Sequence, residues 1–124
     1  EKNINFPSPW LSGLMDPFLN NKKFPLQALV ETNRNCPYQC HFCVWGDFDL
    51  TKIRIFDFDV VIEELRYIFK KAERRFTFMI ADANVGILHR DVQIAEELRR
   101  LSDKYKNVIH HPLINSFEKY PKYH

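Results

Sequence analysis

The stretch Leu26-Gln-Ala-Leu-Val-Glu-Thr-Asn-Arg-Asn-Cys-Pro-Tyr-Gln-Cys-His-Phe-Cys43 joins an apolar run to a cluster of cysteines. Residues 26–32 are mostly apolar and contain no glycine or proline, which predicts a short buried β-strand. The three cysteines of the chain, Cys36, Cys40 and Cys43, follow at once. The sequence therefore predicts a thiol-rich loop at the carboxyl end of a buried strand.

Three thiolates with the spacing C-x-x-x-C-x-x-C are suited to one metal centre. Thiolates are the usual ligands of iron–sulfur clusters, and three of them hold three corners of a [4Fe-4S] cube and leave one iron without a protein ligand. Zinc is an alternative that needs a fourth ligand, for which His41 lies inside the loop. A redox-active pair of Cys40 and Cys43 is a further alternative, but it leaves Cys36 without a role. We favour the cluster, because the sequence has no second C-x-x-C pair of the kind that closes many zinc sites.

Downstream, amphipathic helices alternate with apolar strands. Asp57 or Asp59 can cap a first helix, residues 76–81 form a second strand, Asp91 opens a second helix, and residues 108–113 form a third strand. This alternation predicts an α/β fold with right-handed crossovers and a parallel sheet, either open or part of a barrel. In both architectures the functional groups gather beyond the carboxyl ends of the strands.

Length and composition indicate one domain. The chain has 124 residues, of which 45% are hydrophobic and 15% aromatic, enough for a packed core. Residues 1–25, rich in prolines and aromatic residues, are expected to form an irregular lead-in, and residues 26–124 the α/β domain. Because three strands would leave the sheet with poorly covered edges, we expect the chain to be a fragment of a longer enzyme.

Charge and hydropathy exclude some classes of partner. The net charge of +2 arises from 18 basic and 16 acidic residues that are mixed along the chain, so no nucleic-acid footprint is evident. No apolar run approaches the roughly 20 residues of a membrane span, and the first residues lack the apolar stretch of a signal peptide. We therefore expect a cytoplasmic protein without a membrane partner, where the thiols stay reduced.

Three segments resemble a known family. Residues 31–46 resemble the cluster loop of radical S-adenosylmethionine (radical SAM) enzymes, including the aromatic Phe42 before the last cysteine. Residues 6–13 and 82–91 resemble the cobalamin-associated branch of that superfamily. The chain departs from this branch at Val44, where its members often carry an acidic residue, and the branch's cobalamin-binding domain has no counterpart in these 124 residues.

The resemblance implies a partial, TIM-like radical SAM barrel over residues 26–124. It implies that Cys36, Cys40 and Cys43 ligate a [4Fe-4S] cluster whose fourth iron binds SAM. An electron donor such as flavodoxin or ferredoxin would drive cleavage of SAM to a 5′-deoxyadenosyl radical, which takes a hydrogen atom from a small-molecule or unknown substrate. The branch adds cobalamin as a candidate cofactor of the full-length protein, and methyl transfer as the reaction.

The resemblance also suggests how SAM is held. Phe42 would lie near the adenine, with ordinary core packing as the alternative. Asp82 or Asn84 would accept a hydrogen bond from the ammonium group of SAM, with turn formation as the alternative for both. For Arg90 and Asp91 we expect simpler roles, Arg90 as a solvated side chain and Asp91 as a helix cap.

Two other functions fit the same residues. One is a small iron–sulfur or zinc binding module without SAM chemistry, used for electron transfer or assembly. The other is an inert truncated domain with a structural role. Labile sulfide would distinguish an iron–sulfur module from a zinc module. Cleavage of SAM would distinguish a radical SAM enzyme from both the small module and the inert domain.

Overall fold

The computed structural model describes residues 2–4, 6–72, 76–106 and 108–109. In chain order the elements are β1 (Lys2–Ile4), α1 (Asp16–Leu19), β2 (Gln27–Val30), β3 (Asn33–Arg34), the 3₁₀ turns η1 (Val44–Gly46) and η2 (Phe48–Leu50), β4 (Arg54–Phe56), α2 (Phe58–Lys71), β5 (Phe76–Ile80), α3 (Arg90–Tyr105) and β6 (Val108–Ile109). The predicted alternation of strands and helices after residue 26 is thus observed.

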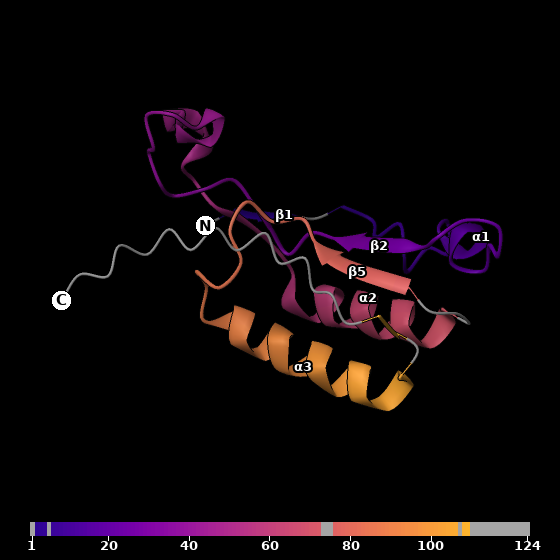
Figure 1. Ribbon diagram of the computed structural model, residues 1–124. Coiled ribbons are helices and arrows are strands. Elements are labelled where there is room, and N and C mark those ends of the chain that lie inside the picture. The colour runs from indigo at the N-terminus through magenta and orange to yellow at the C-terminus, as the bar shows by residue number, and fades with distance from the viewer. Residues whose placement is uncertain (1, 5, 73–75, 107, 110–124) are drawn as a thin grey trace.

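The main sheet is parallel and has the order β2-β5-β6. Gln27 to Val30 pair in register with Thr77 to Ile80, and α2 and α3 lie side by side on one face of this sheet (Figure 1). Each connection between neighbouring parallel strands contains a helix, so the predicted α/β arrangement with crossover helices is confirmed. The third predicted strand begins at Val108, and its residues 110–113 lie outside the described part of the chain.

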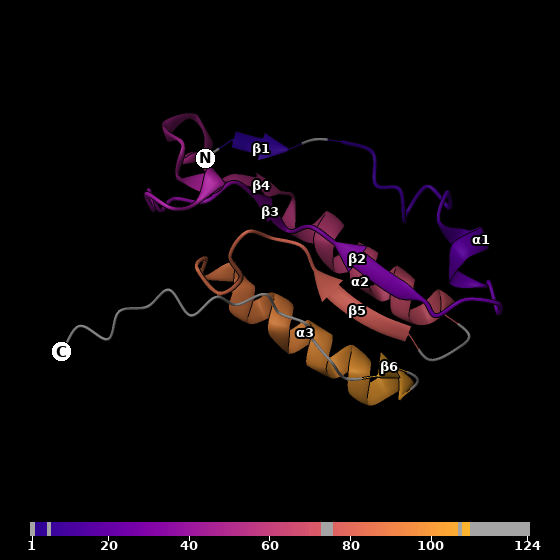
Figure 2. The same ribbon diagram turned by 45° about the horizontal axis from the view of Figure 1, so that its top comes forward.

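A second, smaller sheet has the order β1-β4-β3, and the sequence did not predict it. β1 runs parallel to β4, whereas β3 and β4 form an antiparallel hairpin that pairs Asn33 with Ile55 and Arg34 with Arg54. Strands of two and three residues are too short to show a periodic pattern, which is why they were missed. The cysteine loop is consequently the end of a hairpin and not a direct continuation of β2 (Figure 2).

The core lies between the main sheet and its two helices. Ala28 and Val30 face the helices from β2, and the ring of Phe69 on α2 contacts Phe76 and Phe78 of β5, with centroid distances of 5.4 and 5.9 Å. Each fully buried aromatic side chain contributes about 1.5–3 kcal/mol through the hydrophobic effect. This packing fixes the direction of β2 and β5, and therefore the place where their carboxyl ends meet.

The start of α2 was predicted to have a capping aspartate, either Asp57 or Asp59. Asp57 is the cap, because its side chain accepts hydrogen bonds from the backbone N–H groups of Asp59 and Val60, at 2.9 and 3.2 Å. These bonds satisfy two of the free donors at the helix end. The cap follows β4 directly and so fixes the angle at which the chain leaves the hairpin.

None of the helices in the described ranges is long and apolar enough to cross a membrane. The longest of them, α3, has 16 residues and is rich in charged side chains, whereas a membrane span needs about 20 predominantly apolar residues. The cytoplasmic location and the absence of membrane and nucleic-acid partners stay predictions.

Glu97 joins the two helices. Its carboxylate accepts hydrogen bonds from Arg100, at 2.6 and 2.7 Å, and from Arg66 on α2 at 2.7 Å. These contacts, with Arg100 as the largest contributor, lower the pKa of Glu97 to about 2 against the opposing effect of burial. Because the folded-state pKa lies below the unfolded value of 4.5, the stabilisation is present above pH 4.5 and is lost as the pH falls towards 2.

We expect Glu97→Gln to lower the free energy of unfolding by about 1 kcal/mol at pH 7, since both arginines are half exposed and such pairs contribute little. Chemical denaturation at a series of pH values measures the difference, which should disappear between pH 4.5 and 2. Glu96→Gln, on the exposed neighbouring position, is the control and should change stability by much less. Equal effects of the two changes would contradict the assigned bridge.

Candidate functional site

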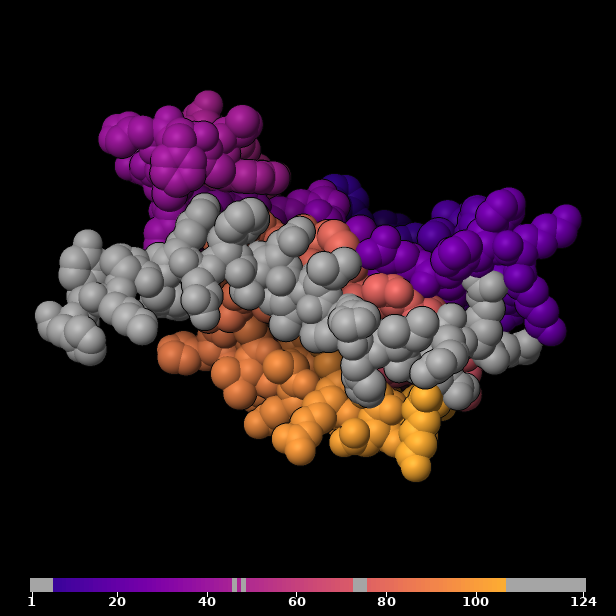
Figure 3. Space-filling model, in the orientation of Figure 1, coloured from indigo at the N-terminus to yellow at the C-terminus, as the bar shows by residue number. Residues whose placement is uncertain are grey.

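The cysteine loop forms a lobe that projects from the body of the molecule (Figure 3). Two contacts across the hairpin close its base: the side-chain amide of Asn35 donates to the carbonyl of Lys52 at 3.0 Å, and the backbone N–H of Cys36 donates to the carbonyl of Leu50 at 3.2 Å. Asn35 has a φ of 72°, in the left-handed region that asparagine tolerates better than most residues. The loop thus leaves the sheet through a defined turn.

The three thiols are free, and their environments differ. Cys36 is buried at the base of the loop, whereas Cys40 and Cys43 are half-buried further out. The backbone N–H of Cys43 donates to the carbonyl of Cys40 at 3.0 Å, which closes a tight turn between them. Within the described ranges, no three His, Cys, Asp or Glu side chains stand together as a metal site. The assignment of these cysteines as ligands stays a prediction.

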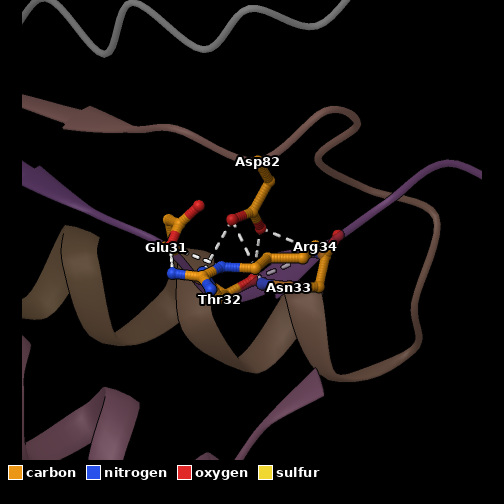
Figure 4. A network of polar contacts seen from close by, with 5 residues as sticks. All are labelled: Glu31, Thr32, Asn33, Arg34 and Asp82. Atoms are coloured by element: carbon orange, nitrogen blue, oxygen red, sulfur yellow. Dashed lines mark hydrogen bonds and ion pairs between the residues drawn. The ribbon is translucent and has the colours of Figure 1, made fainter. Parts of the chain in front are cut away.

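Asp82, just beyond the carboxyl end of β5, is bonded to the segment that follows β2 (Figure 4). Its carboxylate accepts the backbone N–H groups of Thr32 and Asn33, at 2.6 and 3.1 Å, the side-chain amide of Asn33 at 2.8 Å, and the Thr32 hydroxyl. Asp82, Thr32 and Asn33 are all at least 96% buried. The carboxyl ends of two neighbouring strands are therefore joined by one buried carboxylate.

Burial raises the pKa of Asp82 from 3.8 to about 6. The hydrogen bonds from Thr32 and Asn33 act in the opposite direction because they favour the charged form, and nearby Asp91 adds a smaller upward contribution. The side chain predicted to meet the ammonium group of SAM is thus already engaged by four donors. Its role in SAM binding stays a prediction, while its structural role is evident.

Asn84 lies two residues further along the same loop and reaches the cysteine lobe. Its side-chain Nδ2 donates to Sγ of Cys36 at 2.8 Å, and both residues are buried. The sequence predicted both strand-end loops, and the structure brings them into contact through this pair. The role of Asn84 in SAM binding stays a prediction.

Arg90, the first residue of α3, is not the solvated side chain that we expected. Its guanidinium donates to the carbonyl of Phe56 and to the carbonyl of Thr32, both at 2.5 Å. The backbone N–H of Phe56 in turn donates to the carbonyl of Thr32 at 3.1 Å, so this pair continues the β3–β4 ladder. Arg90 therefore fastens the base of the cysteine hairpin to α3.

Asp91 does not cap α3 in the way that we expected. The helix begins one residue earlier, and Oδ2 of Asp91 accepts the backbone N–H groups of Gly86 and Leu88, at 2.9 and 3.0 Å. Gly86 has a φ of 91°, a conformation that glycine adopts without strain. The side chain thus shapes the loop before the helix, the same loop that presents Asp82 and Asn84.

The outer part of the lobe is exposed. Phe42 is 89% exposed, so the alternative that it packs into the core of this chain is wrong. His41, the candidate fourth ligand of a zinc site, is also exposed. Trp45, which follows the last cysteine closely, is 44% exposed. His110, His111 and His124, which are further from the cysteines in the sequence, lie outside the described residues.

The N-terminal segment that resembles the cobalamin-associated branch lies over β2 and α2. Residues Phe6 to Trp10 line one side of a cavity of about 450 Å³, and Arg34, Phe56 and Glu64 lie on its other sides. The Ser8 hydroxyl donates to Oε1 of Glu64, whose pKa is raised chiefly by burial. Of the aromatic residues at positions 6, 10, 18 and 24, Trp10 is buried and contributes to the core, whereas the three phenylalanines are exposed.

Comparison of the sequence with those of known proteins identifies relatives of the chain. No protein-family model matches the chain. It is 40% identical over 100 residues to the 2-(S-pantetheinyl)-carbapenam-3-carboxylate methyltransferase of Streptantibioticus cattleyicolor, a match that covers 78% of the chain and 14% of that enzyme. It is 39% identical over 98 residues to the cobalamin-dependent radical SAM methyltransferase TokK of Streptomyces tokunonensis, with 77% and 14% covered.

The chain is homologous to cobalamin-dependent radical SAM methyltransferases. This homology confirms the resemblance stated from the cysteine loop and its two flanking segments. The chain spans about one seventh of the length of these curated relatives. Their reactions and substrates are therefore properties of much longer proteins.

Two predictions follow from the polar contacts at the base of the lobe. We expect Asp82→Asn to lower the free energy of unfolding by about 2 kcal/mol at pH 7, because an amide nitrogen then faces buried donors. The folded-state pKa is raised, so the stability that this carboxyl group contributes falls as the pH rises from about 4 to about 6. The difference between wild type and variant should be larger at pH 4 than at pH 7, by up to about 3 kcal/mol.

Denaturant titration at pH 4, 5, 6 and 7 measures this difference. Asp103→Asn, at an exposed position of α3, is the matched control and should give a small effect that varies little with pH. A penalty for Asp82→Asn that grows from pH 4 to pH 7 would contradict the sign derived from burial.

Arg90→Lys should loosen the base of the hairpin. A lysine has one ammonium group and lacks the planar fork that reaches two carbonyls at once. We expect amide exchange at Phe56 to accelerate about tenfold, which corresponds to about 1.4 kcal/mol, with a smaller change in β5. Hydrogen exchange followed by mass spectrometry measures both, and Arg99→Lys on the exposed side of α3 is the control. Uniform acceleration over both segments would argue against a local clamp.

Proposed function

We propose that this chain supplies the part of a radical SAM enzyme that binds a [4Fe-4S] cluster and SAM, within a partial TIM-like barrel. The observation that carries the proposal is the placement of three free thiols on a loop clamped at the carboxyl ends of two parallel strands, in a chain homologous to such enzymes. The homology supports methyl transfer with cobalamin as the reaction of the intact protein. The substrate is not part of the proposal.

Cys36, Cys40 and Cys43 are the residues that would hold the cluster. The donor set fits, because three thiols without disulfide bonds are soft ligands of the kind that iron–sulfur clusters take. Bound there, the cluster and SAM together supply the electron transfer and bond cleavage that yield a 5′-deoxyadenosyl radical. The buried Cys36 would bind one iron of the cluster at the base of the loop. Cys40 and Cys43, which are joined by a backbone hydrogen bond across a tight turn, would bind two more.

Cluster binding would place the sulfurs of Cys36, Cys40 and Cys43 around one centre. The base of the loop is held by Arg90 and Asp82, whereas Phe42 and Val44 in its outer part are exposed. Such a base would keep the cluster at a fixed place relative to the sheet. The hydrogen bonds of Arg90 and Asp82 lie at the base of the loop, as this role requires.

SAM would lie beside the lobe. Phe42 offers an exposed aromatic face that can stack on or pack against the adenine. Of the two predicted acceptors for the ammonium group, Asp82 already accepts four hydrogen bonds, so Asn84, whose amide carries a carbonyl oxygen as well as the donor used by Cys36, is the better candidate. Electrons would come from a donor such as flavodoxin or ferredoxin.

Anaerobic reconstitution of the intact protein with iron and sulfide tests the proposal. We expect about four iron and four sulfide per chain, a brown absorbance, and, after reduction with SAM, formation of 5′-deoxyadenosine and S-adenosylhomocysteine. Cys40→Ala should lose the brown colour and both products, because one corner of the cluster loses its ligand. One zinc and no labile sulfide in the wild type would overturn the proposal.

His41→Ala is the matched control, since His41 lies between two of the proposed ligands and is exposed. We expect it to keep iron and sulfide at the wild-type level. A loss of metal equal to that of Cys40→Ala would instead indicate that His41 is a ligand, as a zinc site would need. A brown cluster without any SAM cleavage would favour a small iron–sulfur module.

A further inference from the structure

We propose that Asn84 is a positioning residue for the cluster, and that its hydrogen bond to the sulfur of Cys36 raises the reduction potential of the iron–sulfur centre. This inference rests on the proposed function, because it takes Cys36 to be a cluster ligand. It assigns to Asn84 a task separate from the binding of SAM. The two tasks use opposite ends of one amide group.

The contact itself is direct and shielded from water. Nδ2 of Asn84 lies 2.8 Å from Sγ of Cys36, and the two residues are 5% and 1% exposed. A primary amide nitrogen is a donor only, and a thiolate sulfur is an acceptor, so the direction of the bond is fixed by chemistry. In a buried setting such a bond is electrostatically stronger than in water.

The amide is held in place from both sides. Two residues before it, Asp82 is bonded to Thr32 and Asn33, and after it the N–H groups of Gly86 and Leu88 are bound by Asp91. The loop is therefore constrained on either side of Asn84. The donor is oriented before any cluster is present, which is the property expected of a residue that supports a metal ligand.

A donor at a ligating sulfur draws electron density away from the cluster. The oxidised cluster has less negative charge to stabilise than the reduced cluster, so the hydrogen bond favours the reduced form and raises the potential. Removal of the donor should make reduction harder. A bond that serves only to hold the loop would instead change stability or cluster content and leave the potential where it was.

The test compares midpoint potentials in the intact, reconstituted protein. For Asn84→Ala we expect the ratio of reduced to oxidised cluster at a fixed ambient potential to fall about tenfold, which is about 59 mV for a one-electron couple. Asn84→Asp removes the donor and adds a negative charge, so its shift should be at least as large in the same direction. Redox titration followed by electron paramagnetic resonance gives the values, with iron and sulfide counted in each sample.

Asn35→Asp is the matched control. It makes the same change of charge one residue before Cys36, but the amide of Asn35 is bonded to the carbonyl of Lys52 and not to a sulfur. We expect it to shift the potential by less than half as much as Asn84→Asp. An equal shift would mean that charge alone, without the hydrogen bond, explains the effect, and would overturn the inference.

A second measurement needs no variant at position 84. Asn35→Asp protein labelled with ¹⁵N in the side-chain amides of its remaining asparagines should show a nitrogen coupling in the pulsed electron paramagnetic resonance spectrum of the reduced cluster. Absence of the coupling, or unchanged potentials in Asn84 variants that carry a full cluster, overturns the inference alone. Failure of the wild type to assemble a cluster overturns the proposed function as well.

Discussion

The buried carboxylate of Asp82 is the contact on which the arrangement of the site depends. Parallel pairing of β2 with β5 ends at Val30 and Ile80, and a last backbone hydrogen bond runs from the N–H of Ala81 to the carbonyl of Val30 at 2.9 Å, so any further link must come from a side chain. Asp82 supplies the link, because it accepts the backbone N–H groups of both Thr32 and Asn33. The Asp82 side chain thereby takes the place of further backbone hydrogen bonds between the strands. It satisfies the buried N–H groups of Thr32 and Asn33 where the sheet ends.

The other contacts of the lobe are built on this link. Once Thr32 is held, its carbonyl can accept both the N–H of Phe56 and the guanidinium of Arg90, which fixes the hairpin in place. The loop that carries Asp82 then places Asn84 against Cys36. One loop after β5 thus holds the segment from Thr32 to Cys36 at successive points, and it connects the sheet to the first thiol of the motif.

The sequence predicted the helices and strands that are long enough to show a periodic pattern of apolar residues. β2, α2, β5 and α3 were predicted because apolar residues recur along them at strand or helix spacing. The hairpin of β3 and β4 lacks such a pattern, since Asn33 and Arg34 owe their positions to hydrogen bonds with distant residues. The prediction that Arg90 is solvated was wrong for a similar reason. Its guanidinium binds the carbonyls of Phe56 and Thr32, which are distant in the sequence, and no local pattern indicates such contacts.

The three cysteines have identical chemistry, but the fold treats them differently, and the difference has a physical reason. Cys36 belongs to the clamped base, where its N–H is bonded to Leu50 and its sulfur to Asn84. Cys40 and Cys43 share a turn whose neighbours face solvent. Under the proposed function, Cys36 would tie the cluster to the sheet, and Cys40 and Cys43 would supply the other two ligands from the outer part of the lobe. The hydrogen bonds at the base of the loop would then determine where the cluster lies relative to the sheet.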